Sequence, residues 1–116
     1  MNYRLGVFGW FTSNHLRDTS EGLERSSNFG QLDIIKALEW EKSNINYFGG
    51  DSSNVTIFGE SAGGHNTLTL LASPLSKDLF HRAISQSGYV ESFPIEFAEK
   101  ESLLSSEKLF EKILNF

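Results

Sequence analysis

A short apolar run, Val55-Thr56-Ile57-Phe58, passes directly into the glycine-rich turn Gly59-Glu60-Ser61-Ala62-Gly63-Gly64. A brief run of β-branched and aromatic residues between turn residues is typical of a buried strand in a parallel sheet. The next residues, from His65 to about Leu71, are predicted to form a helix that ends at Ser73-Pro74. This stretch should therefore fold as strand, tight turn and helix, in that order.

The remaining periodicity extends the same alternation. Apolar residues at helical spacing predict a helix over Gln31–Ile45, and a second buried strand is expected at Arg82–Ser85. The segment from Ile95 to Phe116 is predicted to form one or two amphipathic helices, whereas the polar segment Thr12–Ser27 is expected to be a long surface loop. Strands that alternate with helices predict an α/β fold with parallel strands and right-handed crossovers.

Length and composition narrow the function further. The 116 residues suit a single domain over residues 1–116, and a net charge of −5 provides no basic surface for nucleic acid. No apolar run approaches the ~20 residues of a membrane-spanning helix. The absence of cysteine excludes disulfides and thiolate metal sites. Because apolar residues begin at Met1, we expect the chain to start within a fold, which leaves its cellular compartment open.

The turn itself carries a chemical pattern, Gly-x-Ser-x-Gly, formed by Gly59, Ser61 and Gly63. In this pattern the serine lies on a sharp turn between strand and helix, where its hydroxyl is exposed as a nucleophile. The backbone amide of Ala62 would then face a developing oxyanion, assisted by the helix dipole. Gly59 and Gly63 would keep bulk away from the turn. Three fixed residues also occur by chance in ordinary turns, so the predicted strand and helix on either side carry much of this interpretation.

Consecutive blocks of residues run from Asn2 to about Gly88, namely Asn2-Tyr3-Arg4-Leu5-Gly6, Ser27-Asn28-Phe29-Gly30, Asp33, Ala37-Leu38-Glu39-Trp40, Asn44-Ile45, Phe48-Gly49-Gly50-Asp51, Asn54 to Gly64, Ser73-Pro74-Leu75 and Leu79 to Gly88. In this order and spacing they resemble the type-B carboxylesterases, the family related to cholinesterases. The resemblance implies a partial α/β-hydrolase fold whose sheet is incomplete in this chain, and no cofactor.

The resemblance also implies roles for single residues. Ser61 would be the acyl-enzyme nucleophile and the Ala62 amide one oxyanion donor. Glu60 resembles the family's pocket carboxylate, and a solvated turn residue is the alternative. Ser87 resembles a buried serine behind the catalytic triad, and a strand-ending turn is the alternative. The family's acid and histidine would lie beyond Phe116, and its Gly-Gly oxyanion loop before Asn2.

The three histidines of the chain are weak candidates for the missing base. His15 precedes the nucleophile and suits a surface position, whereas His65 lies on the flank of the helix after Ser61. His81, at the entry to a strand, is expected to be structural. The spacing of histidine and carboxylate residues in the sequence does not indicate a metal site. Asn54-Val55-Thr56 matches the N-glycosylation pattern, but we interpret it as a turn.

Taken together, the sequence predicts an internal fragment of a serine esterase that hydrolyses small carboxylic esters, with no turnover in the isolated chain. An inactive esterase-like interaction module, or a gene remnant, is the alternative. The exposed serine at the turn between strand and helix counts against an inactive interaction module. A small doubly wound ligand-binding domain would need a different glycine spacing. The preferred ester and the oligomeric state stay open.

Overall fold

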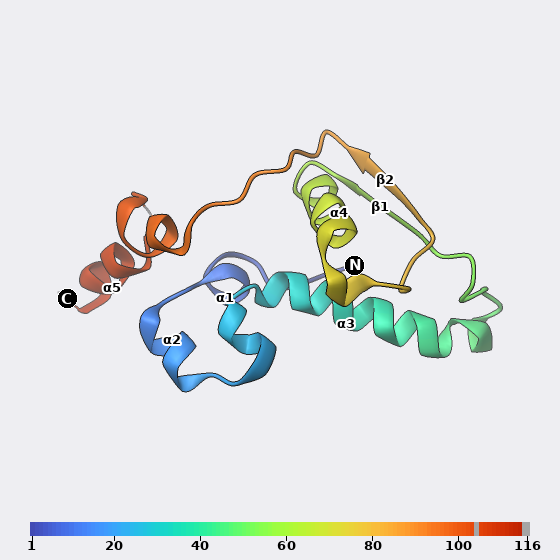
Figure 1. Cartoon of the computed structure of the whole chain (residues 1–116), viewed down its shortest axis with the longest axis horizontal. Coiled ribbons are helices and arrows are strands. Elements are labelled where there is room, and N and C mark those ends of the chain that lie inside the picture. Colours follow the sequence, from blue (N-terminus) through green and yellow to red (C-terminus); the bar gives the residue numbers. More distant parts are fainter. Residues whose placement is uncertain (104, 115–116) are drawn as a thin grey trace. The chain divides into compact units, whose positions relative to one another are not determined.

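The computed structural model describes residues 1–103 and 105–114, and it divides the chain into two compact units. Residues 1–30 and 92–116 form the first unit, and residues 31–91 form the second. Each unit is described by itself (Figure 1). Leu104, Asn115 and Phe116, which the sequence places in the helical tail, lie outside the described residues.

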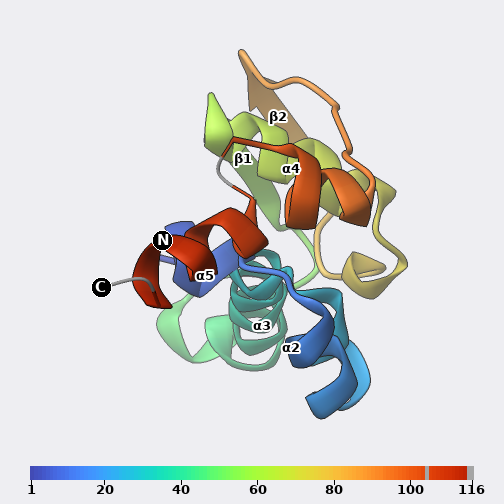
Figure 2. The ribbon, with the colours of Figure 1, turned by 90° about the vertical axis from the view of Figure 1, so that its left-hand side faces the viewer.

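The second unit contains the predicted strand, turn and helix. Strand β1 (Thr56–Glu60) pairs in parallel with β2 (Arg82–Gln86), in a register that sets Thr56 opposite Arg82 and Glu60 opposite Gln86. Helix α4 (Ala62–Ala72) and the short helix η3 (Pro74–Ser76) connect the two strands. Figures 1 and 2 both show α4 packed along this strand pair. The predicted α/β arrangement with parallel strands is therefore confirmed.

Helix α3 (Phe29–Asn44) supplies most of the core of this unit. Ile34, Ile35 and Leu38 recur at helical spacing and are buried, as the sequence predicts. At the two ends of the helix, Gln31 Nε2 donates to the carbonyl of Asn66 at 3.4 Å, and Lys42 Nζ donates to the carbonyl of Asp78 at 2.9 Å. These bonds hold α3 against α4 and against the segment that leads to β2. The helix continues into η2 (Ile45–Phe48), which ends at Gly49 with a left-handed φ of 80°.

The strand pair is more exposed than a buried parallel sheet. Phe58 is 77% exposed and its register partner Ile84 is 52% exposed. Parallel strands are normally covered on both faces by helices. The expectation of buried strands is therefore wrong for this chain, because Phe58 and Ile84 lack the cover that a complete parallel sheet receives.

The first unit is built from short helices. They are α1 (Gly6–Trp10), α2 (Asn14–Thr19), η1 (Gly22–Ser26), η4 (Phe97–Glu101) and α5 (Ser106–Leu114). The tail thus contains two helices, within the predicted range. Ring contacts join Tyr3 to Trp10 and Phe11 to Phe110, with centroids 5.9 and 5.3 Å apart. Within the described ranges, no helix is long and apolar enough to cross a membrane.

The prediction of a long loop over Thr12–Ser27 is wrong, because local capping organises this polar segment. The Ser13 hydroxyl accepts a hydrogen bond from the Leu16 amide at 3.2 Å and so caps α2. Gly22 adopts a φ of 55° where η1 begins, and Ser27 ends η1 with a φ of 57°. Serine and glycine act here as helix signals and not as loop residues.

An ion pair between half-buried Arg17 and buried Glu99 links α2 to η4 within this unit. Arg17 Nη2 donates to Glu99 Oε2 at 3.1 Å, and Arg17 Nη1 donates to Glu99 Oε1. The Thr12 hydroxyl donates to the same Oε1 at 3.2 Å. Glu99 is only 4% exposed. The hydrogen bonds from Arg17 hold the pKa of the Glu99 carboxyl below its usual range, against the opposing effect of burial.

We expect this pair to make the first unit acid-sensitive. A carboxyl whose pKa is lowered on folding contributes stability that is fully present above its unfolded pKa, about 4.3, and is lost as pH falls through the folded pKa. Glu99→Gln should therefore lower the urea midpoint more at pH 7 than at pH 3, because the contribution of the carboxylate shrinks as pH falls below the unfolded pKa. Unfolding in a Trp40→Phe background lets Trp10 report on this unit. An equal effect of Glu99→Gln at both pH values would contradict the prediction.

Candidate active site

Ser61 occupies a strained turn between the end of β1 and the start of α4. Its backbone has φ 53° and ψ −114°, a region that residues other than glycine rarely adopt. Its amide donates to the carbonyl of Gln86 at 2.9 Å, and its carbonyl accepts the first hydrogen bond of α4 from the His65 amide, also at 2.9 Å. The residue is exposed. This geometry is the sharp strand-to-helix turn that the sequence pattern predicts.

The turn is tight because glycine backbones approach one another closely. A Cβ atom at Gly59 would overlap the backbone of Gly63. A Cβ at Gly64 would lie 2.7 Å from the Gln86 carbonyl oxygen, and one at Gly88 would overlap the Ser85 hydroxyl. A Cβ at Gly63, in contrast, meets no described atom within 4 Å. The steric reason given for glycine at this turn therefore holds for Gly59 and not for Gly63.

The amide of Ala62 opens α4, so the helix provides no acceptor for it. Such an orphan donor, at the positive end of a helix dipole, suits an oxyanion. Glu60 and Ser87 are both exposed, and Ser87 has a left-handed φ of 52° directly after β2. Ser61 and Ser87 follow register partners of a parallel pair, so both lie at the same edge of the sheet. In the described chain, Ser87 forms a strand-ending turn and is not buried.

The imidazole rings of His65 and His81 form hydrogen bonds with groups other than Ser61. The Val55 amide donates to His81 Nδ1 at 3.1 Å, at the amino ends of the strands, which confirms a structural role for His81. His65 Nδ1 lies 2.5 Å from the carbonyl oxygen of Tyr89. His15 is exposed on α2. Over residues 1–103 and 105–114, no hydrogen bond joins an imidazole to the Ser61 hydroxyl, and no group of three or more His, Asp and Glu could hold a metal ion.

The residues that hold the turn from the side of β2 were not predicted from the sequence. Gln86 accepts the Ser61 amide through its carbonyl, Gly64 and Gly88 pack backbone to backbone, and Tyr89 contacts His65. The signal available for the glycines was their position, since one follows the serine turn and the other follows a strand. A main-chain acceptor such as the Gln86 carbonyl has no sequence signal.

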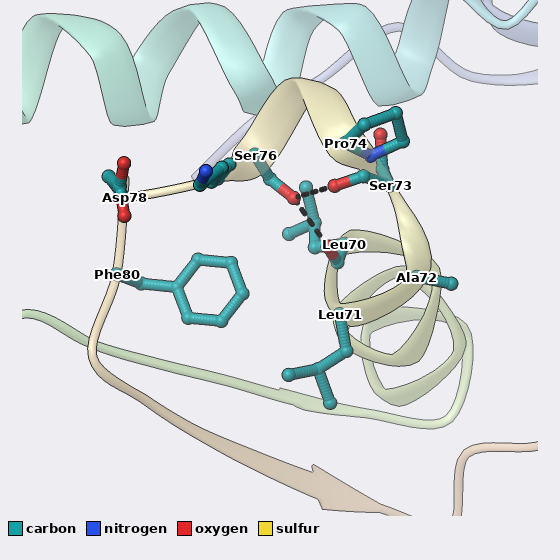
Figure 3. A pocket seen from close by; sticks show the side chains of 9 residues that line it. Leu70, Leu71, Ala72, Ser73, Pro74, Ser76, Asp78 and Phe80 are labelled. Atoms are coloured by element: carbon teal, nitrogen blue, oxygen red, sulfur yellow. Dashed lines mark hydrogen bonds between the residues drawn. The ribbon is translucent and has the colours of Figure 1, made fainter.

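A cavity of about 430 Å³ lies in the same unit but away from Ser61. Its walls come from the carboxyl end of α4, from η3 and from the segment before β2, and Figure 3 shows Leu71 and Phe80 at its apolar side. Since α4 is 11 residues long, its two ends are about 16 Å apart at the helical rise per residue. The cavity is therefore not part of the candidate active site.

Residues 1–109 of the chain match the carboxylesterase family. The chain belongs to the carboxylesterase family. It is 53% identical over 91 residues to liver carboxylesterase B-1 of Rattus norvegicus and 54% identical over 89 residues to liver carboxylesterase 1 of Oryctolagus cuniculus. These matches cover 78% and 76% of the chain. The predicted family is therefore confirmed.

A solved esterase structure supports the same assignment. The thermophilic pNB esterase matches with a TM-score of 0.75 and 40% sequence identity over 99% of this chain. The matched part is 22% of that esterase, and 15% and 14% of the rat and rabbit carboxylesterases. The chain thus spans a small part of its relatives, and the predicted partial α/β-hydrolase fold is confirmed.

The close approach of the Gly59 and Gly63 backbones predicts opposite effects on stability when each glycine is replaced by alanine. Gly59→Ala should lower the free energy of unfolding by about 2 to 3 kcal/mol, because the new methyl group must displace backbone. Gly63→Ala should be neutral or stabilising by up to about 1 kcal/mol, because it adds a good helix former in open space. Urea unfolding of both variants tests this. Equal losses in the two would show that the turn is not packed as described.

The strain at Ser61 predicts an unusual order of stabilities. Relief of an unfavourable φ, ψ pair is worth about 1 to 3 kcal/mol, against which glycine adds up to about 1 kcal/mol of chain entropy to the unfolded state. Ser61→Gly should therefore be more stable than Ser61→Ala by about 1 kcal/mol. At Ser53, whose φ is not positive, the order should reverse. The same order at both sites in urea unfolding would argue against a strained elbow.

Proposed function

We propose that this chain is the nucleophile-bearing part of a serine carboxylesterase that acts on small carboxylic esters. The observation that carries the proposal is the geometry of Ser61, which has φ 53° and ψ −114° between a parallel strand and a helix. Enzymes keep such strain where it positions a reacting group. Membership of the carboxylesterase family supports the same activity.

In the proposed reaction, a base outside residues 1–116 takes the proton of the Ser61 hydroxyl. The Ser61 oxygen bonds to the ester carbonyl carbon, and the Ala62 amide donates to the oxygen that becomes negative. The bond from carbon to the alcohol oxygen then breaks, and the alcohol leaves with the proton from the base. Water, deprotonated by the same base, releases the acid and regenerates Ser61. No cofactor enters this scheme.

The supporting residues act without bonding to the substrate in this proposal. Glu60, next to the nucleophile, contributes negative charge near the reacting centre, where an imidazolium forms transiently. Ser87 lies at the same edge of the sheet and would contact the groups that orient the base. Gly59 allows the close approach that sets the turn. We also propose that residues 1–116 belong to one carboxylesterase domain, supported by the family match over residues 1–109.

A chimera tests the proposed activity, because the chain matches the thermophilic pNB esterase over 99% of its own length. This chain would replace the matched segment of that esterase, which supplies the remaining parts. We expect the chimera to hydrolyse p-nitrophenyl acetate after a burst of one p-nitrophenol per active site. Ser61→Ala should lower kcat by at least about 10³-fold. An organophosphate should label the peptide that contains Ser61.

Ser53→Ala is the matched control, since Ser53 is also exposed and lies in the turn before β1. It should leave the burst and the labelling unchanged. A folded chimera with no burst and no label on Ser61 would contradict the proposed function and favour an esterase-like interaction module.

A further inference from the structure

Two segments run side by side at the elbow and are linked by successive contacts. The Ser61 amide donates to the Gln86 carbonyl at 2.9 Å, and the Ser85 hydroxyl donates to the Gly64 carbonyl at 3.1 Å. A Cβ at Gly64 would lie 3.0 Å from Gly88, so these two backbones touch. Residues 85–89, which we name the brace, therefore support the turn at residues 61–65.

His65 and Tyr89 form the outermost link between these segments. His65 Nδ1 lies 2.5 Å from the Tyr89 carbonyl oxygen, and the two rings contact each other with centroids 5.0 Å apart at 45°. His65 follows Ser61 by one turn of α4, and Tyr89 follows the exposed turn at Ser87. This link therefore joins the first turn of α4 to the chain that leaves β2.

The chemistry of the contact fixes which nitrogen carries a proton. A carbonyl oxygen only accepts, so His65 must donate from Nδ1. Neutral imidazole with a proton on Nδ1 has no proton on Nε2, and imidazolium also donates from Nδ1. The link therefore survives in both charge states of His65, and it needs the Nδ1 tautomer when the ring is neutral.

We infer that His65 is a positioning residue for the nucleophile. It holds Tyr89, and with it the brace, against α4, so that the Gln86 carbonyl stays where it accepts the Ser61 amide. That hydrogen bond opposes relaxation of the strained Ser61 backbone. The catalytic consequence rests on the proposed function, whereas the structural consequence at the Ser61 amide does not.

The first test uses this chain and needs no activity. His65→Ala should speed hydrogen exchange of the Ser61 amide about five-fold relative to the amides of β1, the effect of losing one hydrogen bond. His65→Asn should restore slow exchange, because its amide nitrogen can donate in place of Nδ1. Nitrogen NMR of the wild-type ring should show the Nδ1 proton at neutral pH.

His81→Ala is the matched control. It also removes an imidazole that bonds the backbone across these two strands, but at their amino ends, away from Ser61. It should change exchange along β1 and the Ser61 amide together, with no selective effect on Ser61. Unchanged exchange at Ser61 in His65→Ala, or a selective effect in His81→Ala, would overturn the inference. If His65→Ala does not fold, Tyr89→Ala is the substitute test. It removes the ring but keeps the main-chain carbonyl that accepts from His65, so it should preserve most of the protection of the Ser61 amide.

The second test uses the esterase chimera. His65→Ala should lower kcat about five-fold with little change in KM, since it disturbs the nucleophile and not the substrate pocket, and His65→Asn should recover kcat. A fall in kcat that His65→Asn does not rescue would contradict positioning through this hydrogen bond. An inactive chimera with the exchange pattern intact would count against the proposed function and leave the positioning role of His65 standing.

Discussion

The contact between the backbones of Gly59 and Gly63 determines much of the geometry around the candidate nucleophile, Ser61. Because no side chain separates the end of β1 from the start of α4, the chain must reverse over a single residue. Ser61 takes up that reversal as backbone strain. The strain fixes where its hydroxyl and the Ala62 amide lie, so the position of the candidate active site follows from a packing constraint two residues earlier.

Strain of this kind persists only where neighbouring groups oppose its relaxation. Here the opposing groups come from β2 and the residues after it, through the carbonyl of Gln86 and the packing of Gly88 on Gly64. Parallel pairing brings them to Ser61, because the carboxyl ends of both strands meet at one edge. Strand pairing thus supplies the site as well as the fold.

The sequence predicted the elements whose signals are local and periodic. α3 and both strands begin and end within about two residues of the predicted bounds, and α4 starts three residues earlier than His65. The serine turn followed from its glycines and flanking elements. The helices at Asn14–Thr19 and Gly22–Ser26 were missed because their caps resemble loop composition. The contact between His65 and Tyr89 was also missed, since it depends on how the chain leaves β2 and not on any spacing.

The exposed faces of the sheet and the turn at Ser61 depend on different parts of the chain. Phe58 and Ile84 are exposed, whereas helices cover both faces of a complete parallel sheet. Such cover would come from residues distant in sequence. The turn at Ser61 needs only β1, α4 and residues 85–89, which lie within about 30 residues of one another in the sequence. A chain that spans a small part of its relatives can therefore hold the strained turn at Ser61 while apolar side chains of its strand pair stay exposed. The geometry of the candidate nucleophile in this chain thus depends on local packing and not on cover for the strand pair.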